Sequence, residues 1–520
     1  MTATLSHRQI QVVFLGLMLA MLVAALDQTI VATALPTLVG SLGGVGGLRH
    51  LAWVSTAYLV TSTAAAVLFG KFSDLHDRKR TFQAALLIFL AGSVLAGAAR
   101  SLGELIACRA LQGVGGGGLM ALTTAVVADL VPPRRRGRYV GYLGGTLALA
   151  TVAGPLLGGF FVDHLTWRWI FYVNVPLGLA AFAVIGAVLR LPPKRRTGHR
   201  MDYLGAALLA VMVSSAVLVA SWGGSEHPWG SPPILGLAGA SVLALGTFIL
   251  VERRLGRRGG SPLLPLDLFA NPVVAVTSAV GLVAGLVLFG SVTFLPLFLQ
   301  VAKGASATSS GLLLAPLMGG VLAASVASGR LVTRTGRYKP FPVTGTALMT
   351  VAFWLLSRLR PGTPRGVVAA EMVLLGVGIG PLMQVIVLAS QNAVPVRDLG
   401  LVTSLAQFFR ELGGTFGVAL FGAVFAARFA AELARHLPAA AAAGLGAAVR
   451  GAPAQLRQLP PTTYQPVVEA VARAVDRVFL WAVPFAAAAF LLSLFLRELP
   501  LRDSHEDVAA AEHAPTAEPR

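Results

Sequence analysis

The chain has 520 residues, of which 56% are hydrophobic and 12% are charged, and its mean hydropathy is +0.76. Soluble proteins contain about 45–50% apolar and about 25% charged residues, so this composition excludes a water-soluble globule and predicts an all-α polytopic membrane protein. The net charge of +19 comes from short basic clusters between apolar runs, which favours cytoplasmic loops over a nucleic-acid-binding domain.

Apolar runs follow one another along the chain, and each is close to the roughly 20 residues that a membrane-spanning helix needs. The first run continues to about residue 39, which is too long for the hydrophobic region of a signal peptide, so we expect it to remain as a span. Fourteen spans are predicted, at 12–39, 51–70, 82–99, 103–130, 137–161, 169–190, 203–222, 232–252, 272–300, 308–328, 340–357, 366–392, 399–427 and 478–497.

The charge of the loops predicts the orientation of the chain. The loops that follow spans 2, 4, 6, 8 and 10 carry twenty Lys and Arg residues, whereas the short loops on the opposite side carry seven. The positive-inside rule therefore places the first set and both termini in the cytoplasm. The chain is rich in Ala, Gly and Arg, as in high-GC bacteria, so we expect a multi-pass protein of a bacterial cytoplasmic (inner) membrane.

Two segments near the end of the chain do not resemble spans. Residues 428–477 are predicted to form a long outer connection with helix-like stretches such as "YQPVVEAVARAVDRV". The polar tail 501–520 is predicted to be disordered. Cys108 is the single cysteine, which excludes an intrachain disulfide and a metal–thiolate site.

An internal repeat relates the two halves of the chain. "GKFSDLHDRKR" from Gly70 and "GRLVTRTGRYK" from Gly329 both have Gly first and Arg ninth, and both follow a span. Halves related by a repeat are typical of secondary transporters, which bind substrate near the midplane between them. The offset of 259 residues pairs spans 1–6 with spans 9–14. The predicted units are an N-terminal six-helix bundle (1–190), two inserted helices (191–258), a C-terminal six-helix bundle with the outer loop 428–477 (259–500), and the tail (501–520).

Ionisable side chains within spans are costly in lipid and therefore indicate function. Asp27 lies near the centre of the first span, in "LDQTIVATALP", where an aqueous cavity would let it load and release a proton. The alternative is a neutral, hydrogen-bonded carboxyl with a structural role. Arg109 is predicted in the outer half of the fourth span, and Asp129 at its cytoplasmic end near loop arginines.

A second polar group lies near the middle of the thirteenth span. Gln407 and Glu411 are four residues apart and share a helix face. Two interpretations stay open. Either Arg410 and Glu411 form structural ion pairs with a neighbouring span, or Glu411 faces the central cavity and attracts a cationic substrate or a second proton.

The segment "RALQGVGGGGLM" from Arg109 contains a GxGxxG pattern that invites a dinucleotide-binding interpretation. That fingerprint needs a preceding strand and an acid about 20 residues later, and a phosphate-binding Walker loop needs Lys-Ser/Thr after the glycines. Here the flanks are an unbroken apolar helix, and Leu119 and Met120 follow the glycines. We expect the glycines to allow close approach of neighbouring helices instead.

Taken in order, these motifs resemble the major facilitator superfamily and, more narrowly, its fourteen-span drug:proton antiporter-2 family. "LDQTIVATALP" and "WVSTAYLV", which contains Tyr58, are similar to the first two span signatures. "GKFSDLHDRKR" resembles the loop motif with Gly70, Asp74 and Arg78 in place. It departs from that motif after Asp74 and before Arg78, where Leu and Asp replace the expected Arg and Gly.

Later motifs extend the resemblance over nearly the whole chain. "RALQGVGGG" is similar to a fourth-span motif linked to proton transfer, which points to Arg109. "GPLLGG" resembles the fifth-span motif of exporters, and its family residues are Gly154, Pro155, Gly158 and Gly159. "WRWIFYVNVPLG" and "FFRELGGTFG" add further similarity, and Glu411 occupies the position of an acid that recognises cationic compounds in multidrug members.

The resemblance implies a major facilitator fold with fourteen transmembrane helices, in two six-helix bundles plus two inserted helices. It implies a proton-coupled antiporter that exports drugs or other amphiphilic compounds, cationic ones among them, by alternating access. Its partners would be a small-molecule substrate, protons and the lipid bilayer, without nucleic acid. It would need no cofactor beyond the proton gradient and would function as a monomer.

The resemblance also assigns roles to residues. Proton coupling would rest on Asp27 and Arg109. The substrate cavity would contain Asp27, Tyr58, Gln407 and Glu411. A cytoplasmic latch would contain Gly70, Asp74, Arg78 and Asp129.

Three alternative functions compete with this one. A dedicated exporter of one endogenous metabolite, such as an antibiotic, an amino acid or a lipid, is the nearest. A membrane-embedded enzyme would need clustered His, Cys or carboxylate groups, and the spans contain no such motif. Asp27 and the exporter motif argue against a passive channel or sensor.

Overall fold

A computed structural model gives the structure of the chain. It describes residues 7–47, 51–131, 133–189, 202–224, 227–258, 260, 262–304, 313–395, 398–436 and 460–501. Most of the tail predicted at 501–520, and the loop between the sixth and seventh spans, therefore lie outside the described residues.

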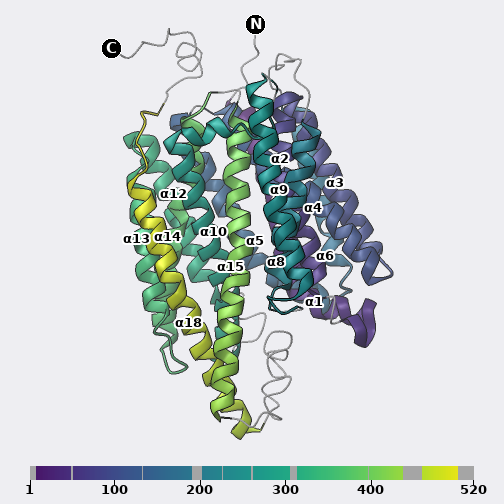
Figure 1. The fold of residues 1–520 in the computed structure, drawn as a ribbon, viewed down its shortest axis with the longest axis vertical. Coiled ribbons are helices and arrows are strands. Elements are labelled where there is room, and N and C mark those ends of the chain that lie inside the picture. Colours follow the sequence, from purple (N-terminus) through teal and green to yellow (C-terminus); the bar gives the residue numbers. More distant parts are fainter. Residues whose placement is uncertain are drawn as a thin grey trace.

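The described part of the chain is a bundle of long helices (Figure 1). A short 3-10 turn, η2 (Leu266–Ala270), precedes the second half. The helices, in chain order, are α1 (His7–Gly47), α2 (Leu51–Leu75), α3 (Arg78–Ala98), α4 (Leu102–Leu130), α5 (Pro133–His164), α6 (Trp169–Tyr172), α7 (Asn174–Val188), α8 (Tyr203–Trp222), α9 (Pro232–Arg257), α10 (Pro272–Val301), α12 (Ala315–Thr335), α13 (Pro340–Leu356), α14 (Arg365–Asn392), α15 (Leu399–His436) and α18 (Pro461–Leu494).

Thirteen helical segments among the described residues are long and apolar enough to cross a membrane, with α6 and α7 counted together as the sixth. The shorter apolar helix α13 supplies the remaining predicted span. Each of the fourteen predicted spans therefore coincides with a helix, which confirms the predicted all-α membrane fold.

The same packing pattern occurs in both halves of the chain. In the first half α1 packs on α5 and α7, and α4 packs on α2 and α3. In the second half α10 packs on α15 and α18, and α14 packs on α12 and α13. The two halves meet where α2 contacts α15 and where α5 contacts α12. This arrangement matches the offset of the sequence repeat, in which α2 corresponds to α12.

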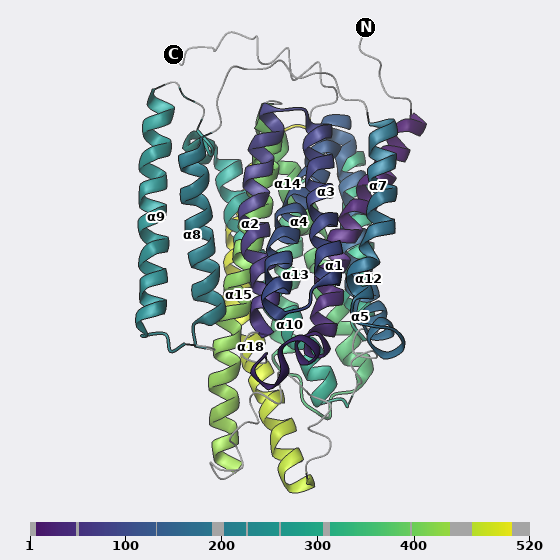
Figure 2. The ribbon, with the colours of Figure 1, turned by 90° about the vertical axis from the view of Figure 1, so that its right-hand side faces the viewer.

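α8 and α9, the two helices that the sequence predicts to be inserted between the bundles, lie side by side at one edge of the structure (Figure 2). α8 packs against α2, α15 and α9. On α9, Val242 and Leu243 are 71% and 72% exposed. Apolar side chains at this exposure need a lipid environment, so α9 presents its outer face to the bilayer.

The two ends of the bundle differ in character. We call the end where α2, α4 and α12 finish the basic end, because it carries Arg78, Arg136 and Arg334, and we call the opposite end the far end. Arg136 is buried there and donates hydrogen bonds to the carbonyl oxygens of Val131 and Ala128 at 2.7 and 2.6 Å. These contacts satisfy free carbonyl groups at the end of α4, where a cation also complements the helix dipole. Burial lowers the pKa of Arg136 to about 10.

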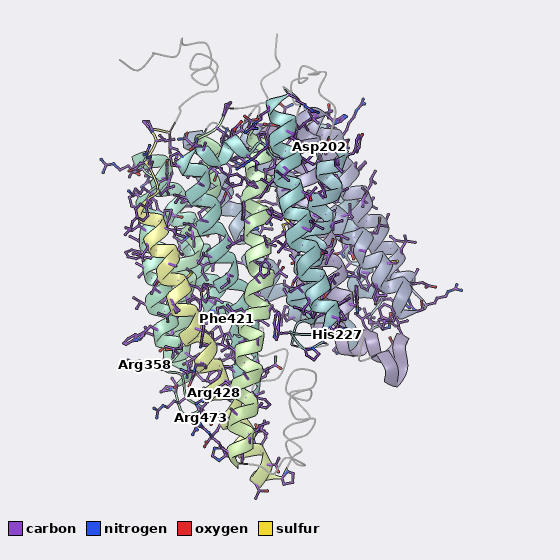
Figure 3. All side chains as sticks on the ribbon, in the orientation of Figure 1. Asp202, His227, Arg358, Phe421, Arg428 and Arg473 are labelled. Atoms are coloured by element: carbon purple, nitrogen blue, oxygen red, sulfur yellow. The ribbon has the colours of Figure 1, made fainter. Side chains whose placement is uncertain are left out.

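At the far end α15 and α18 project beyond the other helices (Figure 1). Within the outer connection predicted at 428–477, the described residues 428–436 and 461–477 are therefore helix, including the stretch that the sequence marked as helix-like, and residues 437–459 lie outside the described residues. Glu432 is fully buried between the two helices and forms ion pairs with Arg428, Arg435 and Arg473. Figure 3 shows Arg358, Arg428 and Arg473 near this end, with Asp202 at the basic end.

The glycine run of α4 lies against its neighbours, as expected from the sequence. A β-carbon on Gly117 would lie 2.0 Å from the carbonyl oxygen of Ser62 in α2. A β-carbon on Gly115 would lie 2.4 Å from the amide nitrogen of Phe89 in α3. Both contacts are with backbone atoms that cannot turn aside, so the glycines let α4 approach two helices closely. The dinucleotide interpretation is excluded, since α4 continues through the whole motif.

Candidate functional site

Asp27 lies at the centre of a buried polar cluster to which five helices contribute: α1, α2, α3, α4 and α7. Its side chain is fully buried in α1. Oδ2 lies 2.5 Å from Nη1 of Arg109 in α4. Oδ1 accepts hydrogen bonds from Nε2 of Gln112 at 2.7 Å and from Nδ2 of Asn174, the first residue of α7, at 3.0 Å. Both carboxylate oxygens are thus occupied by donors, an arrangement that suits the ionised form.

Arg109 is 2% exposed and is held from several sides. Nη1 also donates to Oε1 of Gln112 at 2.7 Å, and Nε donates to the carbonyl of Val54 in α2 at 3.4 Å. The guanidinium lies over the ring of Tyr58, 4.5 Å from its centroid, which is the geometry of a cation–π contact. A second charge partner for Arg109 is absent from the described ion pairs, so Asp27 alone balances it.

Ser93 of α3 closes the cluster. Its hydroxyl accepts hydrogen bonds from Gln112 at 3.2 Å and from Asn174 at 3.0 Å, and donates to the carbonyl of Phe171 at 2.9 Å. The sequence analysis assigned no role to Gln112, Asn174 or Ser93, although Gln112 lies in "RALQGVGGG" and Asn174 in "WRWIFYVNVPLG". Each of them is a polar but uncharged side chain in an apolar span. This is a weaker indication of function than a charge, because an uncharged polar group is less costly to bury than a charged one.

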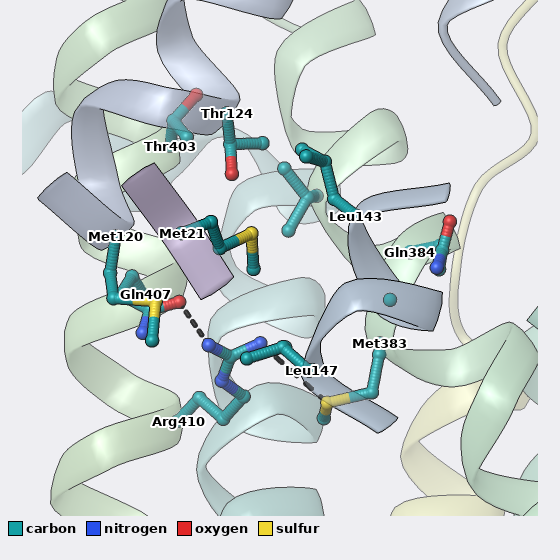
Figure 4. Close-up of a pocket in the computed structure, with 12 residues that line it drawn as sticks. Met21, Met120, Thr124, Leu143, Leu147, Met383, Gln384, Thr403, Gln407 and Arg410 are labelled. Atoms are coloured by element: carbon teal, nitrogen blue, oxygen red, sulfur yellow. Dashed lines mark hydrogen bonds between the residues drawn. The ribbon is translucent and has the colours of Figure 1, made fainter. Parts of the chain in front are cut away.

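A second site lies between the two halves (Figure 4). It is a small cavity of about 40 Å³. Its described lining residues come from α1, α4 and α5 on one side and from α14 and α15 on the other: Met21, Met120, Thr124, Leu143, Gly144, Leu147, Met383, Gln384, Val387, Thr403, Gln407 and Arg410. The cavity therefore occupies the place, between the repeats, where secondary transporters bind substrate.

Of the four residues expected at the substrate cavity, the structure places one in the described lining and three outside it. Gln407 lines the cavity. Asp27 and Tyr58 belong to the buried cluster instead, because their side chains point to Arg109. Glu411 is also outside the described lining, and its Oε1 accepts a hydrogen bond from Nε2 of Gln407 at 2.6 Å. Arg410, a structural ion-pair partner in one of the two interpretations left open by the sequence, has no ion pair among the described residues and points into the cavity.

The residues expected to form a latch come together at the basic end. Arg78 is buried and forms ion pairs with Asp74 and, at 2.8 Å, with Asp129. Oδ2 of Asp74 accepts a hydrogen bond at 2.8 Å from the backbone nitrogen of Leu401, in the first turn of α15. Asp74 thus satisfies a free N–H at a helix N-terminus and joins the first half of the chain to the second.

Close packing at glycines also joins helices near these sites. A β-carbon on Gly70 would lie 2.0 Å from Oγ of Ser404, so α2 and α15 touch beside the latch. In the "GPLLGG" motif a β-carbon on Gly154 would lie 2.0 Å from Oγ1 of Thr29, two residues after Asp27. α5 continues through Pro155. Of the other two motif glycines, Gly158 is buried and Gly159 is partly buried. The motif therefore packs α5 against the part of α1 that carries the carboxylate.

Comparisons with known proteins agree with this architecture. A family model described as Major Facilitator Superfamily matches residues 17–418. An uncharacterized MFS-type transporter of Mycobacterium tuberculosis is 42% identical over 500 residues, which cover 95% of this chain and 71% of that protein. The multidrug transporter protein MdtP of Bacillus subtilis is 39% identical over 410 residues, covering 79% and 74%. Among solved structures, the proton:xylose symporter XylE bound to 6-bromo-6-deoxy-D-glucose has a TM-score of 0.62 at 15% identity, covering 97% of this chain and 99% of that one.

Proposed function

The chain belongs to the major facilitator superfamily of membrane transporters, and on that premise we propose that it is a proton-coupled antiporter exporting amphiphilic compounds, drugs among them, by alternating access. One observation carries the proposal: a carboxylate, Asp27, buried in a membrane span and paired with a single cation, Arg109. Such a pair is costly in a membrane and is the kind of group that relays protons. The direction of transport and the kind of substrate are supported by the "GPLLGG" motif and by relatives named as a multidrug transporter protein and as a multidrug resistance protein, both of Bacillus subtilis.

We propose that protonation of Asp27 is the step that couples the transport cycle to the proton gradient. A proton on Asp27 cancels its charge, so Arg109 loses its only described charge partner and must rely on Gln112 and the carbonyl of Val54. A buried guanidinium without a counter-charge is strongly unfavourable. The cluster is therefore expected to rearrange, and α1 and α4 with it.

The same two helices connect this cluster to the cavity. Met21 precedes Asp27 by six residues, roughly 9 Å along α1 at about 1.5 Å per residue. Met120 follows Arg109 on α4 and lines the same cavity. Proton and substrate would thus occupy separate sites and act on each other through helix movement, rather than compete for one carboxylate. Such coupling needs only that each ligand prefer a different conformation.

Alternating access requires the halves to separate at one end at a time. The Asp74–Leu401 hydrogen bond and the Gly70–Ser404 contact hold them together at the basic end. We place this end in the cytoplasm on the charge of its loops, with both termini on that side, in the inner membrane of a bacterium. Opening towards the cytoplasm would then break the latch, and a monomer would suffice for the cycle.

The latch makes a testable prediction. Asp74→Asn removes the charge that pairs with Arg78 and weakens the bond to Leu401, so the form open at the basic end should gain population. Loss of a charge-assisted hydrogen bond is worth roughly 1.5–3 kcal/mol, or about a 10- to 150-fold shift. Spin labels at Arg80→Cys and Arg334→Cys, in a Cys108→Ser background, should show a longer distance by electron–electron double resonance.

The control for the latch is Asp77→Asn. Asp77 is exposed, lies three residues after Asp74 between α2 and α3, and caps α3 through a 2.8 Å hydrogen bond from the backbone nitrogen of Arg80, which an asparagine can also accept. Its distance distribution should equal that of the unsubstituted chain. If Asp74→Asn and Asp77→Asn gave equal distance distributions, the contacts of Asp74 would not hold the basic end closed.

A transport assay tests the proposed function itself. Proteoliposomes with an imposed pH gradient should export amphiphilic compounds faster than empty liposomes, and collapsing the gradient with a protonophore should stop the excess flux. A panel of unrelated compounds then separates a multidrug exporter from a dedicated exporter of one metabolite. Flux that continues at the same rate without a gradient would contradict proton coupling.

A further inference from the structure

The charged group inside the central cavity is a cation. Among the described lining residues, Arg410 is the one with an ionisable side chain, and its guanidinium lies between the side chains of Gln407 and Met383 (Figure 4). Nη2 donates to Oε1 of Gln407, and Nη1 lies 3.6 Å from the sulfur of Met383. Nε is buried without a hydrogen-bond partner among the described residues. A thioether is a weak acceptor, so the guanidinium is poorly satisfied.

The neighbouring acid does not neutralise Arg410 by direct contact. Glu411 directly follows Arg410 in α15, and its Oε1 accepts a hydrogen bond from Nε2 of Gln407. Oε1 of the same Gln407 accepts from Arg410. The amide of Gln407 therefore stands between the two charges. Neither residue takes part in an ion pair within the part of the chain that the structure describes. Because Glu411 also lies outside the lining, a ligand in the cavity meets the guanidinium and not the carboxylate.

The rest of the lining is apolar or neutral. Met21, Met120 and Met383 contribute flexible, polarizable side chains that adapt to different apolar shapes. At about 40 Å³ the cavity is far smaller than the roughly 300–1,000 Å³ of a drug-sized site, so it must widen as the halves move apart. After this widening, Arg410 would face an open site, and N–H groups of its guanidinium would be free to donate hydrogen bonds to a ligand.

We infer that the central cavity binds amphiphilic organic anions, with the carboxylate or similar acidic group on Arg410 and the apolar body among the methionines. This inference rests on the proposed export function and specifies its substrate class. The guanidinium fork matches a carboxylate in a bidentate geometry, and pairing relieves a buried, poorly satisfied charge. The Arg410 guanidinium thus attracts an anionic ligand and repels a cationic one.

Binding of three probes with one apolar body tests the inference. The probes are 1-naphthaleneacetate, the neutral 1-naphthaleneacetamide and the cationic 1-naphthaleneethylamine, titrated calorimetrically into the full chain in nanodiscs, with empty nanodiscs as the blank. We expect the acid to bind about tenfold more tightly than the amide, as a charge-assisted hydrogen bond predicts. Arg410→Gln should reduce this preference to about twofold or less, and Arg410→Lys should keep part of it because the charge remains.

The control variant is Arg358→Gln. Arg358 stacks on Trp354 at 3.8 Å, outside the cavity lining, and its loss should leave the preference for the acid unchanged. Equal binding of acid and amide, or a preference that survives Arg410→Gln in a folded, monodisperse protein, would overturn the inference. Preference for the amine that Glu411→Gln abolishes would instead assign the cavity to cations. None of these titrations uses a proton gradient, so failure of the inference and failure of proton coupling are separate results.

Discussion

Asp27→Asn is expected to abolish proton coupling while the transporter still folds. The amide has nearly the shape of the carboxylate but cannot take up or release a proton. In inside-out vesicles, substrate-induced proton release should therefore fall to the level of vesicles without the protein. Pyranine fluorescence measures the release, and the amount of protein in the membrane is checked by immunoblot.

The contacts of Asp27 determine the cost of this change to stability. Oδ2 accepts from Arg109 and Oδ1 accepts from Gln112 and Asn174, so an amide group must turn its own N–H donors towards one side of the cluster. An unsatisfied buried donor costs about 1–3 kcal/mol, which the thermal unfolding temperature in detergent should reveal. The double variant Asp27→Asn/Arg109→Gln removes the uncompensated charge and should recover part of that loss without restoring proton release. Proton release that persists in either variant would exclude Asp27 as the coupling group.

Gly117→Ala is expected to give the largest loss of stability among single-methyl substitutions in α4. The added β-carbon would lie 2.0 Å from the carbonyl oxygen of Ser62, and backbone of α2 must shift to admit it. Overpacking of this kind costs about 1–3 kcal/mol. Tyr58 and the carbonyl of Val54 lie on α2, so the shift should also disturb the contacts of Arg109. We expect a lower unfolding temperature together with a reduced transport rate.

Gly103→Ala is the matched control on the same helix. A β-carbon on Gly103 meets no atom within 4 Å, so the substitution adds helix propensity without a clash. Its unfolding temperature should equal or slightly exceed that of the unsubstituted chain, and its transport rate should not change. If the two alanine variants unfold at the same temperature, close packing of α2 on α4 is not what the glycines provide.

The sequence predicted the number and type of elements because the membrane makes a strong demand on local composition. Every span must be apolar over about 20 residues and must satisfy its backbone internally, so helices are visible one at a time. The requirement for an apolar composition ends at the membrane surface. For this reason the sequence set the start of the last span at 478 and assigned the helix-like stretch before it to the outer connection, whereas α18 begins at Pro461 and projects beyond the bundle.

The sequence also identified the buried charges, since lipid penalises each charge wherever it lies in a span. It named Asp27, Arg109, Arg410 and Glu411 on that ground. It could not say which of them meet. Asp27 and Arg109 are 82 residues apart and form an ion pair, whereas Arg410 and Glu411 are adjacent and form none among the described contacts.

Composition and spacing by themselves thus determined an all-α membrane protein with fourteen spans, an internal repeat, the close-packing role of the glycines and the charges that lipid would not accept. The tertiary structure decided which side chains share a site. It brought Ser93, Gln112 and Asn174 to Asp27, and it separated Asp27 from the central cavity. It also turned Arg410, rather than Glu411, into that cavity. The physical reason is that burial in lipid is a property of one helix, whereas a hydrogen bond or a cavity depends on how several helices are rotated and packed against one another.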